Sequence, residues 1–184
     1  MINLKFNLQR LKNTYGLTII SNRHKNTKIG CLLDTGANVP VWCAGEESLK
    51  SYYHNCHKQD AVFLLRGFGR GYEIAKVYII PDFILSDGKE EIHYNNLIVA
   101  VVGRDFSFNM ILSYTMFNKM NISIDTFTNR NGTHNVAPNL RISSVKDTYM
   151  VRYKLADLSN FNKQTICQKC GTERILDSIY VFNQ

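Results

Sequence analysis

The chain has 184 residues, of which 45% are hydrophobic and 20% are charged. This length suits one domain with at most a small appendage, and the composition is that of a globular protein rather than a disordered one. The formal net charge is +7, but the 22 lysine and arginine residues are scattered and form no long basic run. We therefore interpret the charge as a solvated surface and expect no nucleic-acid partner.

The sequence also indicates where in the cell the protein is located. Its first residues lack a charged start followed by an apolar core of roughly 7–15 residues, which a secretory signal requires. No apolar run approaches the ~18 residues of a membrane span. The five cysteines are an odd number, which argues against a disulfide framework. We expect a cytoplasmic protein with no membrane partner.

The N-terminal part of the chain has a strand pattern. Residues 2–8 alternate between apolar and polar side chains, as a half-buried strand does. A turn is expected at Tyr15-Gly16, followed by a second strand at residues 17–20. The loop at residues 21–26 leads into a third strand that ends at Asp34, so we predict a β meander.

The turn after this third strand is the first candidate for chemistry. The apolar run ends at Asp34, and Thr35 and Gly36 turn the chain before Ala37. Burial at the end of an apolar strand disfavours an ionised carboxylate, so such an aspartate points to a functional site. The alternative is an ordinary turn aspartate that accepts backbone N–H groups. Trp42, the only tryptophan, follows soon after and is expected in the core.

A glycine-rich stretch is the second unusual feature. A strand that begins at Ala61 runs into Gly67, Gly69 and Gly71, and another strand follows at residues 73–80. Glycine inside a strand marks a bend, a bulge or a close approach of the backbone to a ligand. A phosphate-binding loop would need a Lys-Ser/Thr ending and a following helix. We predict a mobile hairpin tip, with a glycine-rich turn of no special role as the alternative.

The remaining segments complete a β domain. The Asp87-Gly88 pair between two alternating runs predicts a hairpin. The nearly all-apolar residues 96–102 are expected to form a central strand. The other expected elements are a helical rhythm at 45–53, a strand at 110–113, two helical turns at 114–120 and a last strand at 121–125. We predict an all-β fold, mainly β with one short helix.

In this order, the motifs resemble the retropepsins, the single-domain aspartic proteases of retroviruses and of related bacterial proteins. The resemblance covers roughly residues 15 to 127. It rests on Leu32-Leu33-Asp34-Thr35-Gly36-Ala37, the glycine-rich stretch from Arg66 to Gly71, and Ile111-Leu112 before a short helix. One position departs from the pattern, because Ser113 stands where the family usually has glycine.

The resemblance implies a closed, bent β-sheet of the acid-protease fold, in a single lobe that pairs as a C2 dimer. The chain contains one Asp-Thr-Gly, and Asp125-Thr126-Phe127 lacks the glycine, so a catalytic pair needs two copies. Two carboxylates about 3 Å apart share one proton. One of them can activate a water while the other protonates the amide carbonyl. The implied catalytic residues are Asp34, Thr35 and Gly36, and the implied substrate-binding residues are Ala37, Gly67, Phe68 and Gly69.

The C-terminal part is less informative. Residues 128–139 have linker composition, which gives a domain at 1–127 and an extension of unknown role at 140–184, with strands expected at 149–155 and 175–181. Cys167 and Cys170 have the spacing of half a zinc site. A tetrahedral site needs two further ligands, for which Cys43, Cys56, His57 or a partner copy are the candidates. We predict no metal and no cofactor.

Three functions follow from these observations. The main hypothesis is a homodimeric aspartic endopeptidase acting on polypeptides, with Asp34 of each protomer as the catalytic pair. The alternative is a module of retropepsin fold that binds extended peptides or dimerises without cleaving them. The third hypothesis is a basic nucleic-acid binder with a C-terminal zinc knuckle.

Overall fold

A computed structural model describes residues 1–11, 14–22, 27–66, 73–104, 106–125, 139–152 and 179–183. Most of the described chain is β-structure, which confirms the predicted mainly-β class, and one α-helix and one 3-10 helix accompany the strands. The elements are β1 (Ile2–Asn7), β2 (Gln9–Leu11), β3 (Thr14–Asn22), β4 (Thr27–Asp34), β5 (Val41–Trp42), α1 (Glu46–Tyr52), β6 (His57–Arg66), β7 (Glu73–Ser86), β8 (Glu91–Val101), β9 (Met110–Ser113), η1 (Tyr114–Phe117), β10 (Asn121–Asp125), β11 (Asn139–Ser144), β12 (Thr148–Tyr149) and β13 (Ile179–Asn183).

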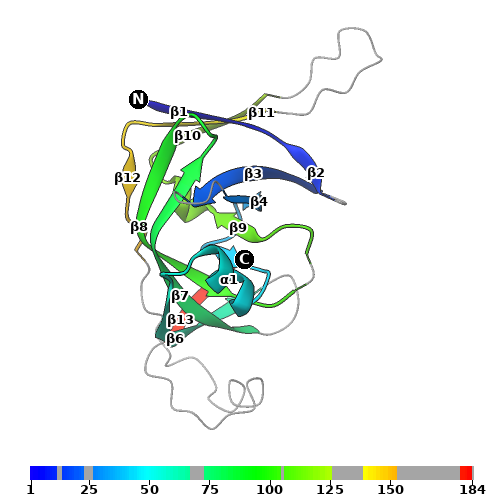
Figure 1. Ribbon diagram of the computed structural model, residues 1–184, viewed down its shortest axis with the longest axis vertical. Coiled ribbons are helices and arrows are strands. Elements are labelled where there is room, and N and C mark those ends of the chain that lie inside the picture. Colours follow the sequence, from blue (N-terminus) through cyan, green and yellow to red (C-terminus); the bar gives the residue numbers. More distant parts are fainter. Residues whose placement is uncertain are drawn as a thin grey trace.

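The strands form two sheets. The larger one has ten strands in the order β13-β6-β7-β8-β5-β9-β4-β3-β2, with β12 beside β8. The smaller one has the order β1-β11-β10. Figure 1 shows the larger sheet curled, with the smaller sheet at the end opposite to β6 and β13. Strand β8 lies in the interior of the larger sheet, as its apolar sequence predicted.

Alternation in the sequence explains how β1 packs. Leu4 and Phe6 are buried, whereas Asn3 and Lys5 on the opposite face are exposed. This pattern confirms the half-buried strand expected near the N-terminus. Trp42 is also buried, as predicted, and its ring centroid lies 5.4 Å from that of Tyr52 on α1.

The predicted Asp87-Gly88 hairpin connects β7 to β8. Its ends pair at Ser86 and Glu91. The Asp87 Oδ1 atom accepts the N–H groups of Lys89 and Glu90, at 2.8 and 2.9 Å. Gly88 has a φ of 94°, a conformation that glycine adopts without strain. Side-chain and backbone geometry together therefore account for this turn.

Two local predictions were wrong. Tyr15 and Gly16 do not form a turn: they lie within β3, where Gly16 pairs with Gln9 of β2. Strand-forming neighbours on both sides outweigh the turn preference of a single glycine. The two helical turns expected after Ser113 are one 3-10 turn, because Asn118, with φ −61° and ψ 134°, is extended and ends the helix directly after Phe117. The helix α1, at Glu46–Tyr52, coincides with the helical rhythm expected at residues 45–53.

Strands from the predicted C-terminal extension take part in both sheets. Strand β11 lies between β1 and β10, and β12 and β13 pair with β8 and β6 of the larger sheet. The domain boundary at residue 127 stays a prediction, and the Cys167-Cys170 pair lies outside the described residues. Within the described part of the chain, no helix is long and apolar enough to cross a membrane.

A carboxylate ties α1 to the larger sheet. Glu46 begins the helix, and its side chain accepts hydrogen bonds from Lys76 Nζ, at 2.6 Å, and from the Tyr78 hydroxyl on β7. The Lys76 bond, followed by the Tyr78 bond, lowers the Glu46 pKa from its ordinary value of 4.5 to about 2. The folded protein therefore favours the ionised form of this side chain.

This arrangement predicts a component of acid unfolding. Because the pKa is lowered in the fold, the stabilisation is complete above pH 4.5 and is lost as the pH falls toward 2. Glu46→Gln should lower the free energy of unfolding at pH 7 by about 1 kcal/mol. The variant should also lose less stability than the natural protein between these pH values in urea titrations. Glu47→Gln, at an exposed position of the same helix, is the control. Equal pH dependence in all three proteins would contradict this account.

Candidate active site

Asp34 is the last residue of β4 and the first of a tight turn. Its backbone oxygen accepts the N–H of Ala37 at 3.1 Å, and its Oδ1 atom accepts the N–H of Gly36 at 2.9 Å. These two bonds close the turn and fix the plane of the carboxylate. The Asp34 side chain is half-buried, and Thr35 and Gly36 are exposed. A carboxylate thus stands at the surface in one defined orientation, as the side chain of a turn aspartate does.

The turn rests on the parallel pairing of β4 with β9. Cys31, Leu32, Leu33 and Asp34 pair in register with Met110, Ile111, Leu112 and Ser113. The two strands therefore end side by side, and the chain continues from β9 into η1. The first N–H of η1, from Tyr114, donates to the Ala37 oxygen at 3.1 Å. The turn is held from both ends by strand β9 and its continuation.

Asn109 holds the beginning of the same strand pair. Its side-chain oxygen accepts the N–H of Gly30 at 3.0 Å, and its own N–H donates to the Gly30 oxygen at 2.8 Å. Both backbone groups of one β4 residue are therefore bonded to a single residue before β9. The strand pair is fixed about one residue before its register begins.

Ser113, the departure from the family pattern, has a defined role in the fold. Its side chain is fully buried, and its Oγ lies 2.6 Å from Thr115 Oγ1. The Thr115 hydroxyl donates to the Asn38 oxygen at 3.0 Å, so the proton between the two hydroxyls comes from Ser113. This relay connects the end of β9 to the residue that follows the Asp34 turn. A glycine at position 113 would lack it.

Gly36 lies close to the carboxylate of Asp34. A Cβ atom at this position would lie 3.2 Å from Asp34 Oδ1, which is closer than most real contacts of this kind. A larger residue would therefore displace the carboxylate or lengthen the bond that orients it. The glycine in Asp-Thr-Gly follows from this close approach.

Four of the seven predicted site residues lie in this one turn. Ala37 is fully buried, and both its backbone groups are bonded, so its contact with a substrate stays a prediction. Gly67, Phe68 and Gly69 lie outside the described residues. The strands on either side of them pair antiparallel up to Leu65 and Glu73, so residues 66–72 connect the two strands of a hairpin.

Sequence reasoning missed the residues that support the turn. Thr115 and Asn38 are 77 positions apart, and Asn109 and Gly30 are 79 apart. No spacing rule links such positions, because only the pairing of β4 with β9 brings them together. Ser113 is the one signal of these contacts in the sequence, because a serine stands there in place of the glycine that is usual in the retropepsins.

The described cysteines do not form a second site. Cys31 and Cys43 are buried thiols, and burial raises the pKa of both, that of Cys43 to about 12. Burial also raises the pKa of the Cys56 thiol. Such thiols are poor nucleophiles and poor metal ligands at neutral pH. Among the described residues, no three His, Cys, Asp or Glu side chains gather as a metal site would require.

Comparison of the sequence with protein-family models and with curated proteins gives no match.

The Ser113 relay yields a prediction about stability. Ser113→Ala removes the donor to Thr115 and leaves a buried acceptor with one partner fewer, so the free energy of unfolding should fall by about 1 kcal/mol. Ser113→Ala and Thr115→Val should not add in a double-mutant cycle, because they break one network. Ser107→Ala, at an exposed position before β9, should change stability little. Additive effects of the two substitutions in urea unfolding would argue against the relay.

Proposed function

We propose that the chain is an aspartic endopeptidase of the retropepsin type, active as a homodimer. The observation that carries this proposal is the Asp34 turn. It presents a half-buried carboxylate at the end of paired parallel strands, oriented by the Gly36 N–H and supported by η1. An acid-protease fold would place the same turn of a second copy opposite to it.

In this proposal the two Asp34 carboxylates face each other across the twofold axis. They share one proton and titrate in two separate steps. The ionised carboxylate takes a proton from a bound water, whose oxygen attacks the amide carbon. The protonated carboxylate donates its proton to the carbonyl oxygen. The carboxyl group that took the proton from water then donates it to the amide nitrogen, and the C–N bond of the tetrahedral intermediate breaks. No covalent bond between enzyme and substrate forms.

Exposed apolar side chains near the turn support a second copy as the partner. Tyr114 is 49% exposed although its N–H is bonded to the turn. Ile122 and Ile124 on β10 are 36% and 52% exposed. The two isoleucines lie on the face of β10 whose register partners in β11, Ile142 and Leu140, are buried. Association of two copies would bury them.

The edges of the smaller sheet limit the ways in which a second copy can approach. Two outer N–H groups of β1 are already used: Asn3 donates to Glu90 Oε2 at 2.9 Å and Lys5 donates to Asp87 Oδ2 at 3.0 Å. Strand β11 is paired on both sides. Of the two edge strands of this sheet, β1 has hairpin carboxylates on its outer edge, and no such bonds are seen for β10 among the described residues. We propose that the partner approaches through β10 and the exposed turn.

The hairpin of β6 and β7 supplies the remaining part of the proposal. Residues 67–72, with three glycines, would close over an extended polypeptide and exclude water from the carboxylates. The substrate would pair with this segment as an added strand. Backbone hydrogen bonding of this kind accepts many sequences, which suits an endopeptidase.

Asp34→Asn should abolish cleavage of a denatured proteome and leave the fold intact. Asparagine keeps the oxygen that accepts the Gly36 N–H, but a pair of amides cannot take a proton from water. Asp82→Asn, an exposed aspartate on β7, should keep full activity. An inhibitor of aspartic proteases should block the natural protein. Mass spectrometry of the peptides formed is the measurement, and undiminished cleavage by Asp34→Asn would refute the proposal.

The competing function is a module that binds peptides without cleaving them. It is favoured if the natural protein forms dimers and binds denatured polypeptides, yet releases no new peptide ends at any pH from 3 to 8.

A further inference from the structure

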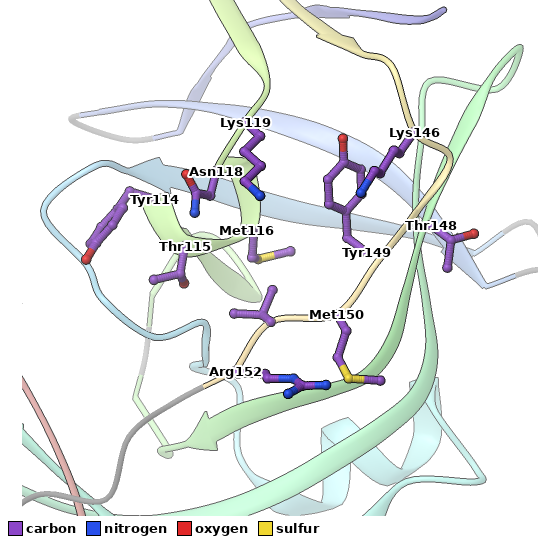
Figure 2. A pocket seen from close by; sticks show the side chains of 11 residues that line it. Tyr114, Thr115, Met116, Asn118, Lys119, Lys146, Thr148, Tyr149, Met150 and Arg152 are labelled. Atoms are coloured by element: carbon purple, nitrogen blue, oxygen red, sulfur yellow. The ribbon is translucent and has the colours of Figure 1, made fainter.

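A pocket of about 380 Å³ lies between η1 and the segment 146–152. Figure 2 shows its lining, with Met116 at its centre and Met150 on the side of Arg152. Its volume is within the range of pockets that hold small ligands or single peptide side chains. The elements that form it come from both sides of the predicted linker.

Three cations surround this pocket. Lys119 and Lys146 approach it from one side and Arg152 from the other (Figure 2). All three are exposed, and no acidic residue lines the pocket. Within the described part of the chain none of the three has an ion-pair partner, whereas Lys76 and Arg104 each pair with a glutamate. Positive charge thus gathers here without local neutralisation.

Two of the neutral polar side chains of the pocket take part in hydrogen bonds within the fold. The Thr115 hydroxyl is bonded to Ser113 and to the Asn38 oxygen. The Tyr149 hydroxyl is bonded to Ser144. The apolar part of the lining comes from Met116, Met150 and Val151. A ligand with negative charge and an adjoining apolar group therefore fits the pocket.

Lys119 occupies a backbone position that does not suit lysine. The Met120 N–H donates to the Phe117 oxygen at 3.1 Å, Asn118 has φ −61° and ψ 134°, and Lys119 has φ 65°. This is a type II turn with lysine at the position where glycine is preferred. A lysine at this position, despite its backbone cost, points to a use for the side chain.

The pocket shares its wall with the Asp34 turn. Tyr114 and Thr115 line the pocket, and both hold the turn, through the Ala37 and Asn38 oxygens. The pocket and the turn are therefore neighbours in the fold, which lets one extended polypeptide contact both.

We propose that this pocket binds acidic side chains of the polypeptide substrate, so that the protein selects polypeptides with glutamate or aspartate a few residues from the cleaved bond. This inference rests on the proposed peptidase function and names the substrate class for it. Lys119, Lys146 and Arg152 contact the acidic side chains, and Met150 and Val151 contact the neighbouring apolar ones.

The test uses the full chain carrying Asp34→Asn, so that binding is measured without cleavage. The probes are a fluorescent peptide with a block of glutamates beside an apolar pair, the same peptide with glutamines, and an oligonucleotide of equal charge. Lys119→Gly should weaken binding of the glutamate peptide about threefold, and the triple change Lys119→Gly, Lys146→Gln and Arg152→Gln by tenfold or more. Lys119→Gly should not lower thermal stability, since glycine suits this turn.

Lys50→Gln on α1 removes the same charge elsewhere and should leave binding unchanged. The proposal is overturned if the glutamine peptide binds as tightly as the glutamate peptide, if Lys50→Gln weakens binding as much as Lys119→Gly, or if the oligonucleotide binds more tightly than either peptide.

The same peptides, offered to the protein with Asp34 intact, separate this inference from the peptidase proposal. If kcat/KM for the glutamate peptide falls in the triple variant and that for the glutamine peptide does not, both proposals are supported. Cleavage without any preference for glutamate overturns the pocket assignment alone. Binding of the glutamate peptide that depends on Lys119, with no cleavage, overturns the peptidase alone.

Discussion

The parallel pairing of β4 with β9 is the constraint on which the candidate site depends. It sets Asp34 beside Ser113, so that the turn after one strand and the 3-10 helix after the other begin at the same edge of the sheet. The Gly36 N–H that orients the carboxylate belongs to the turn itself, and the long-range contacts that support the turn follow from this register. The Tyr114 N–H reaches the turn, and the Ser113 hydroxyl reaches Asn38 through Thr115. A slip by one residue would move every side chain of β4 to the opposite face and remove these contacts together.

The two sheets have different roles in the proposed site. The larger sheet fixes the carboxylate, and the smaller sheet determines which surfaces a second copy can approach. Strand β11 fills the place between β1 and β10 within one chain, and the carboxylates of the β7–β8 hairpin close the outer edge of β1. The proposed dimer is thereby restricted to β10 and the turn. The segment that follows β11 then forms one wall of the cationic pocket, so the C-terminal part belongs to the proposed substrate site.

The sequence predicted those features that depend on local pattern. Alternation identified β1, the apolar run identified β8, and Asp87-Gly88 identified the hairpin. The prediction failed where tertiary pairing decides. Gly16 lies in a strand because β2 pairs with it, and β11 was missed although residues 139–142 alternate, since the preceding linker composition dominated the interpretation. The Asp34 turn was recognised from four adjacent residues, whereas Thr115 and Asn109 enter the site from more than 70 positions away.

The central claim is that Asp34 is inert in one chain and active where two copies meet. Mixing subunits tests it most directly. The natural protein is refolded together with a ninefold excess of the Asp34→Asn variant, at concentrations where both are dimeric. Random pairing should reduce the activity per natural chain to about a tenth, because most natural chains then have an inactive partner. The same excess of Asp82→Asn should cause no loss. Undiminished activity per natural chain in the presence of the Asp34→Asn variant would show that one chain suffices and would contradict the account.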